Sequence, residues 1–230
     1  MDNFEIYDNA FQTLSLMVMM IVSGAAGLKY SSRKLVVLAC AYGSIMLGTL
    51  FYMLHLTIIG DIPRIFYVSE ISWMAGYLFF LFLVTLRHEW KKVTFQPVPA
   101  MLALCTIAAS VHSEVMGNSV LMSLAFGAIA GAIVYISSVR IRRARLSGTP
   151  AAAFDLMMIA VVILQILVYF VSEYISDFST FNLYFAVDIL FTISLCSLFW
   201  MVRREARQPG PILKMCLSAF PYRCCFLCFW

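Results

Sequence analysis

The chain has 230 residues, of which 63% are hydrophobic and 12% are charged. A soluble domain carries about 25% charged residues, so this composition excludes an ordinary soluble fold and predicts a helical membrane protein. The net charge of +4 does not indicate nucleic-acid binding, because the basic residues form short clusters between apolar runs and no single basic patch.

Seven apolar runs follow one another along the chain, and about 20 residues suffice to cross a hydrocarbon core of roughly 30 Å. We therefore predict an all-α, polytopic bundle of seven transmembrane helices, at residues 10–28, 35–59, 65–86, 98–113, 119–139, 152–175 and 181–202. The first run is not expected to be a signal peptide, because Asp2, Glu5 and Asp8 precede it where a signal peptide has positive charge.

The orientation of the bundle follows from its short loops. Alternate loops and the C-terminal segment hold 15 of the 16 Lys and Arg residues, and only Arg64 falls on the other side. Basic loops stay in the cytoplasm, so we predict an N-terminus outside and a C-terminus inside, in the plasma (inner) membrane. This placement requires an odd number of spans, which agrees with seven.

Two segments differ in composition. Residues 1–207 form the predicted transmembrane domain, and residues 208–230 form a tail that begins after the last span with two prolines. The tail mixes aromatic residues with four cysteines and is too short and broken to span a membrane, so we expect it to lie on the inner membrane face. Palmitoylation of its cysteines is an alternative. We expect no metal site and no cofactor.

Polar residues recur every three or four positions in several spans, which puts them on one face of a helix. Lipid cannot satisfy such groups, and an acid inside a span indicates function by default. Asp188 is the strongest candidate because it lies about 10 Å into its span. If the polar faces converge, they form an outward-facing pocket that binds a ligand or handles protons, lined by Tyr52, His55, Glu70, Trp73, Tyr77, Gln165, Tyr169, Glu173, Tyr184 and Asp188.

Comparison with seven-helix families narrows the function. Retinal proteins need a Lys in the last span, and rhodopsin-like receptors carry an Asn-Pro-x-x-Tyr motif there, and this last span has neither. SWEET and PQ-loop carriers use prolines inside helices as hinges, and no proline falls in the interior of a predicted span here. The general arrangement is similar to the seven-helix input modules of bacterial membrane sensors, which implies a sensing function by analogy.

The sequence therefore favours a sensor or receptor-like protein that takes a small polar or cationic ligand from the outer side. A cytoplasmic partner would read its basic inner loops. The first alternative is a proton-coupled carrier of a small solute, with Asp188 as the titrating group. The second is an intramembrane enzyme that uses His55 with Glu70 or Asp188, although we assign no catalytic residue and the balance is against an enzyme. The third expected partner, beside the ligand and the cytoplasmic protein, is the lipid bilayer, and no nucleic acid is expected.

Overall fold

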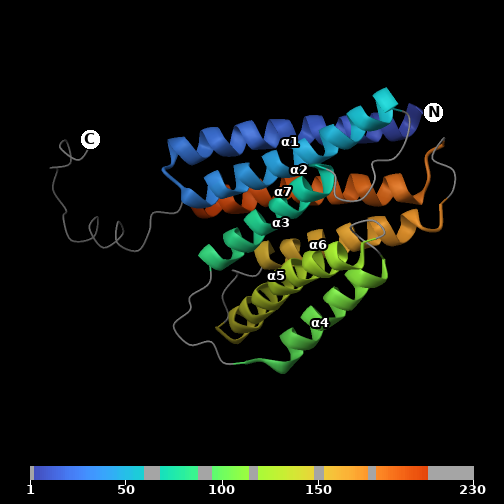
Figure 1. Cartoon of the computed structure of the whole chain (residues 1–230). Helices are drawn as coiled ribbons and strands as arrows, with labels where there is room; N and C mark the ends of the chain where they lie inside the picture. Colours follow the sequence, from blue (N-terminus) through green and yellow to red (C-terminus); the bar gives the residue numbers. More distant parts are fainter. Residues whose placement is uncertain are drawn as a thin grey trace, which may run out of the picture.

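A computed structural model describes residues 3–59, 68–87, 95–113, 119–147, 153–175 and 180–206. These residues form seven helices (Figure 1), α1 (Asn3–Lys29), α2 (Arg33–Ile59), α3 (Val68–Leu86), α4 (Pro97–His112), α5 (Val120–Ser147), α6 (Ala153–Ser172) and α7 (Leu183–Ala206). Six of them are long and apolar enough to cross a membrane, and α4 is apolar but shorter. The chain is thus an integral multi-pass membrane protein with an all-helical bundle. The predicted tail, 208–230, lies outside the described residues.

Consecutive helices run antiparallel, and most helices pack against at least two others (Figure 1). The first three helices pack side by side, and α7 packs against α1, α2 and α6. Next to α3 lies α5, which also contacts α4 and α6. At the edge of the bundle, α4 packs on α5 and, to a smaller extent, on α6. The polar faces of α1, α2, α3, α6 and α7 can therefore meet inside the bundle without α4.

Two helices are longer than the hydrophobic runs predict. The first begins at Asn3, seven residues before the predicted start at Ala10, because Glu5 and Asp8 lie on the helix and not in a solvated leading segment. The fifth continues to Ser147, beyond the predicted end at Val139. Its last turns are basic, and Arg140 still packs against neighbouring helices. The remaining helix ends lie within about four residues of prediction, the usual uncertainty of helix boundaries.

Glycines let several helix pairs approach closely, as expected where small residues replace bulky ones at membrane helix contacts. A Cβ atom on Gly127 would lie 3.2 Å from the Ile107 Cα of α4, and one on Gly131 would lie 3.1 Å from the Ala103 carbonyl oxygen. The glycines of α5 therefore pack within the chain, against α4. The pairing of Gly127 with Ile107 and of Gly131 with Ala103 also shows that the two helices are antiparallel.

Substitution of two glycines by alanine is expected to have opposite effects. At Gly48 of α2, a Cβ atom would lie 2.6 Å from Trp73 Cδ1 and 2.9 Å from the Ser69 carbonyl oxygen. Gly48→Ala should push α3 away and lower the free energy of unfolding by about 2 kcal/mol. At Gly24, the nearest atom would be Ala39 Cβ at 3.9 Å, so Gly24→Ala should instead gain about 0.5–1 kcal/mol from reduced backbone entropy. Equilibrium unfolding in mixed micelles measures both, and equal effects would contradict the α2–α3 packing.

Candidate functional site

Asp188 lies inside the bundle and is hydrogen-bonded to a side chain of the first helix. Its carboxyl group is on α7, and the residue is 8% exposed. The Gln12 amide nitrogen Nε2 of α1 lies 3.3 Å from Asp188 Oδ1 and 3.2 Å from Oδ2, and it is also 3.2 Å from Thr192 Oγ1. Gln12 is 7% exposed, so these bonds are shielded from solvent and lipid. These hydrogen bonds connect α7 to the N-terminal half of α1, which is the half predicted to lie toward the outer side of the membrane.

The same amide continues the network into two more helices. Thr49 of α2 donates its hydroxyl proton to Gln12 Oε1 over 2.8 Å, and the Trp73 indole N–H of α3 donates to Thr49 Oγ1 over 3.3 Å. The donors thus run in one direction, from Trp73 to Thr49 to Gln12 to Asp188. Because Gln12 needs its oxygen for Thr49, its NH₂ group must face Asp188. Four helices are joined through this one glutamine.

A second carboxyl group belongs to the network. Asp8 is 7% exposed, and its carboxyl group lies close enough to that of Asp188 for a hydrogen bond. Two ionised carboxylates only accept hydrogen bonds, so a bond between them requires that one carries a proton. We define the polar cluster as Asp8, Gln12, Thr49, Trp73, Asp188 and Thr192.

Tyrosines extend the polar cluster toward α6. The Tyr52 hydroxyl of α2 donates to Glu5 Oε1 over 3.2 Å, and the Tyr77 hydroxyl of α3 donates to Gln165 Oε1 of α6 over 3.2 Å. Tyr169 lies within electrostatic range of Glu70 and Asp188, and Tyr184 lies within range of Asp188 and Asp8. Acids and aromatic rings from α1, α2, α3, α6 and α7 therefore share one end of the bundle.

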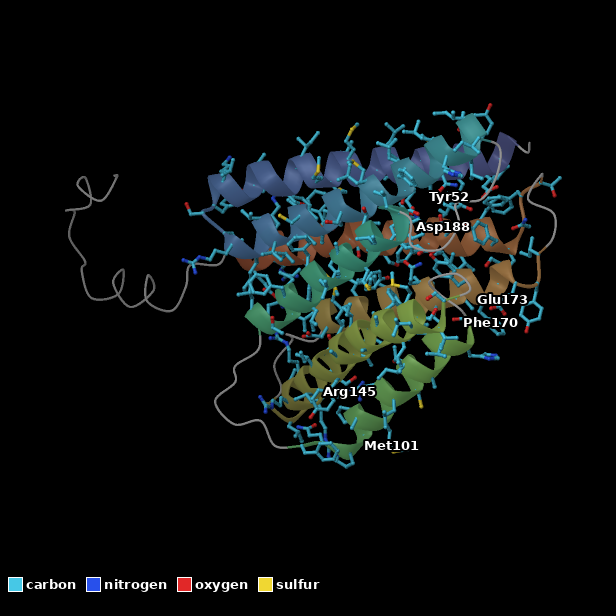
Figure 2. All side chains as sticks on the ribbon, viewed as in Figure 1. Tyr52, Met101, Arg145, Phe170, Glu173 and Asp188 are labelled. Carbon is cyan, nitrogen blue, oxygen red and sulfur yellow. The ribbon has the colours of Figure 1, made fainter. Side chains whose placement is uncertain are left out.

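The structure brings eight of the ten predicted site residues into or next to the polar cluster, namely Tyr52, Glu70, Trp73, Tyr77, Gln165, Tyr169, Tyr184 and Asp188. The other two lie apart. Glu173 is exposed just after the end of α6, and Figure 2 shows it away from the labelled Tyr52 and Asp188. His55 is partly exposed, with its ring centroid 6.1 Å from that of Phe51. A ligand-binding role for any of these residues stays a prediction.

Three residues of α1 contact this site and were missed by the sequence reasoning. Glu5, Asp8 and Gln12 were treated as part of a solvated leading segment or were not considered. Their spacings of three and four residues put them on one helical face, the same signal that identified the stripes of α6 and α7. The predicted start at residue 10 separates Glu5 and Asp8 from Gln12 and so hides the face that the three residues share on α1.

The opposite end of the bundle holds a cluster of ion pairs. The Arg87 guanidinium group, after the end of α3, pairs with Glu205 in the last turn of α7 and lies 3.8 Å from the Phe154 ring centroid. Lys34 Nζ of α2 lies 3.4 Å from Glu205 Oε2. Arg140 of α5 donates to the Arg87 carbonyl oxygen, and its Nε lies 3.0 Å from Asp155 Oδ2 of α6. We name these five charged residues the ionic cluster.

The buried position of Arg87 has an electrostatic consequence. The Arg87 side chain is only 2% exposed, whereas the Glu205 side chain is 36% exposed. Burial lowers the pKa of Arg87 from its ordinary value, and the Glu205 carboxylate partly offsets this effect by raising it. Arginine remains charged in proteins, so the structure holds a buried cation that depends on Glu205 and on the Phe154 ring.

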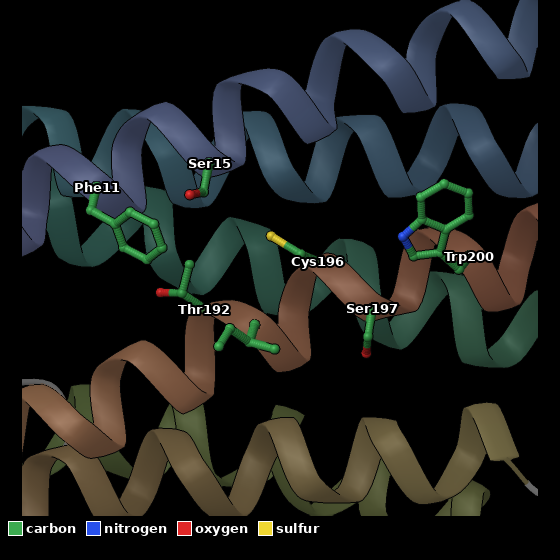
Figure 3. Close-up of a pocket in the computed structure, with 7 residues that line it drawn as sticks. Phe11, Ser15, Thr192, Cys196, Ser197 and Trp200 are labelled. Carbon is green, nitrogen blue, oxygen red and sulfur yellow. The ribbon is translucent and has the colours of Figure 1, made fainter.

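A shallow groove of about 260 Å³ lies on the surface between α1 and α7 (Figure 3). Phe11 and Ser15 of α1 face Thr192 and Cys196 of α7 across it, and Trp200 lies toward the basic end. It meets the polar cluster at Thr192. Among the described residues, no group of three or more His, Cys, Asp or Glu side chains is placed to hold a metal ion.

No protein family model matches the chain, and neither a curated protein nor a solved structure shows significant similarity to it.

Proposed function

We propose that this membrane protein is a sensor or receptor-like protein, which binds a small polar or cationic ligand at the polar cluster from the outer side of the plasma (inner) membrane. The observation that carries this proposal is the convergence of acids and aromatic rings from five helices around Asp188. In this orientation the N-terminus is outside, and a cytoplasmic partner reads the basic inner surface.

The charge distribution supports a cationic or hydrogen-bond-donating ligand. Glu5, Asp8, Glu70 and Asp188 gather at one end of the bundle, while the described Lys and Arg residues lie at or near the other end. Such separation gives a negative electrostatic potential to the end of the bundle that holds the polar cluster, and this potential attracts cations and repels anions. Trp73, Tyr52 and Tyr184 add ring faces, which bind cations at about 0.5–2 kcal/mol each.

Three of the helices that carry the polar cluster, α2, α3 and α7, also reach the ionic cluster, and they offer a route for a signal. On α7, Asp188 and Glu205 are about 25 Å apart along the helix axis. On the α3 side, Trp73 belongs to the polar cluster, and Arg87 follows the end of the helix. A ligand that moves α7 relative to α3 at one end changes the Arg87–Glu205 contact at the other, because both helices are rigid over this distance.

Ligand-dependent stabilisation tests this function. The purified protein in lipid nanodiscs is screened for thermal stability against a panel of primary amines, quaternary amines, amino acids and sugars. We expect at least one amine to raise Tm in the wild type and not in Asp188→Asn, because the variant removes the negative charge from the centre of the polar cluster. His112→Gln, on the peripheral α4, is the matched control and should keep the response. Absence of any response across the panel, or an unchanged response in Asp188→Asn, would contradict the proposal.

A second candidate function is a proton-coupled carrier, and the observation that favours it is the pairing of the two buried carboxyl groups of Asp8 and Asp188. A carrier predicts solute uptake into sealed vesicles that is driven by a pH gradient and disappears in Asp188→Asn. The same solute panel used for stabilisation distinguishes the two functions, because a receptor binds the solute and does not move it.

A further inference from the structure

The contact between α1 and α7 is built from groups that are buried and polar. Asp8 and Gln12 on α1 face Asp188 and Thr192 on α7, and all four residues are less than one-tenth exposed. The Gln12 amide is the donor to Asp188, and it also contacts Thr192. An apolar contact would not depend on charge, but the strength of this one depends on the ionisation of its two carboxyl groups.

The chemistry of a carboxyl pair restricts the number of protons it holds. With one proton, the two groups form a short-range hydrogen bond and carry a single negative charge, to which Gln12 donates. With no proton, two negative charges face each other in a medium of low dielectric constant, and neither group can donate to the other. Gln12 has one NH₂ group, which already serves Asp188 and Thr192.

The neighbouring groups do not neutralise a second charge. The titratable side chains around the pair are Glu5 on the same helix, Tyr52 on α2, Glu70 on α3, Tyr169 on α6 and Tyr184 on α7. Of these, Glu5 and Glu70 are acids and the tyrosines are neutral. His55 is partly exposed, one turn beyond Tyr52. The described Lys and Arg residues lie at or near the other end of the bundle.

We propose that the α1–α7 contact is a proton-sensitive switch, in which one proton shared by Asp8 and Asp188 holds the N-terminal half of α1 against α7, and loss of that proton separates the two helices. Separation widens the groove of Figure 3, since Phe11 and Ser15 move away from Thr192 and Cys196. The switch does not depend on the identity of the ligand and operates in a receptor and a carrier alike.

The pH dependence of stability gives the first test. Isolated carboxyl groups in an unfolded chain lose their protons near pH 4. Above this pH the folded state binds one proton more than the unfolded state, so the folding equilibrium constant falls as pH rises, by tenfold per pH unit, until the pair has lost its shared proton. Equilibrium unfolding of the full chain in mixed micelles from pH 4 to pH 9 measures this slope.

Asparagine variants isolate the contribution of the pair. An Asn side chain at position 8 or 188 donates an N–H to the remaining carboxylate without a proton from solvent. Asp8→Asn and Asp188→Asn should therefore each fold without the tenfold fall per pH unit that the shared proton causes in the wild type. As pH rises, their folding equilibrium constants should exceed that of the wild type by a growing factor. His55→Gln, at the partly exposed histidine one turn beyond Tyr52, is the control and should keep the wild-type slope. Two variants are used because either one alone could fail to fold.

Labelling of Cys196 tests the movement itself. Cys196 lines the groove, while Cys40 on α2 is exposed and serves as an internal reference. The maleimide labelling rate of each cysteine is measured by peptide mass spectrometry in the full chain, and the Cys196-to-Cys40 ratio is compared between wild type and Asp8→Asn at the same pH. We expect equal ratios at pH 5 and a ratio several-fold higher in the wild type at pH 8. Equal slopes in wild type and both Asn variants, or equal labelling ratios at both pH values, would overturn the switch.

Discussion

Replacing Gln12 by Leu is expected to lower the free energy of unfolding by about 3 kcal/mol. An interhelical hydrogen bond in a membrane protein contributes about 0.6 kcal/mol on average. Gln12, however, bonds to Asp188, Thr192 and Thr49, and one of these partners is a carboxyl group. Leu has a similar size but no polar atom, so each buried partner left unsatisfied adds about 1–3 kcal/mol of desolvation cost. Equilibrium unfolding in mixed micelles gives the value directly.

A control for this substitution exists on α2. Thr57 is exposed, and its hydroxyl donates to the Met53 carbonyl oxygen one turn earlier in the same helix. Thr57→Val removes a hydrogen bond without disturbing a second helix, and we expect a change below about 0.5 kcal/mol. If Gln12→Leu cost no more than Thr57→Val, Gln12 would not be the residue that joins the four helices.

The helices could be predicted from the sequence because each apolar run is long and uninterrupted. The polar faces of α3, α6 and α7 were also visible, since periodic spacing shows which residues share a face. The contacts between helices could not be predicted, because periodic spacing does not show which neighbouring helix a polar face contacts. Asp188 illustrates this limit, since its stripe was identified, but its partners Asp8 and Gln12 lie about 180 residues earlier in the chain.

The ionic cluster shows a different reason for incomplete prediction. Asp155 lies in the first turn of α6, where an acid complements the dipole of its helix, and the sequence alone suffices to predict that role. The ion pair with Arg140 could not be anticipated, because the predicted fifth span ends at residue 139, whereas α5 continues through Arg140 to Ser147. The predicted orientation of the bundle and the seven spans remain predictions.

For the ionic cluster, we predict that loss of Glu205 destabilises the protein more than loss of Arg87 does. Glu205→Met is expected to lower the free energy of unfolding by about 3 kcal/mol, and Arg87→Met by only about 1–2 kcal/mol. The difference follows from burial. Without Glu205, the buried Arg87 guanidinium group loses its main counter-charge, and an uncompensated buried charge typically costs about 3–5 kcal/mol. Without Arg87, the partly exposed Glu205 still meets water and Lys34.

Unfolding measurements on both variants, with Arg204→Met as a control, test this asymmetry. Arg204 is exposed and next to Glu205 in the chain, so its loss should change the free energy of unfolding by less than about 0.5 kcal/mol. A larger cost for Arg87→Met than for Glu205→Met would show that stacking of Arg87 on Phe154 matters more than the ion pair does.

The short fourth helix has a consequence for the surrounding lipid. Its 16 residues extend about 24 Å, several ångströms less than a typical hydrocarbon core of about 30 Å. If α4 crosses the bilayer, as the sequence predicts, lipid chains meet this short helix directly, because α4 lies at the edge of the bundle. Its neighbour α5 is 28 residues long. The bilayer would be thinner on this side of the protein than around α1 and α7. Such local thinning favours residence in membranes with shorter acyl chains. It also means that the bilayer is thinnest on one defined side of the protein, beside α4.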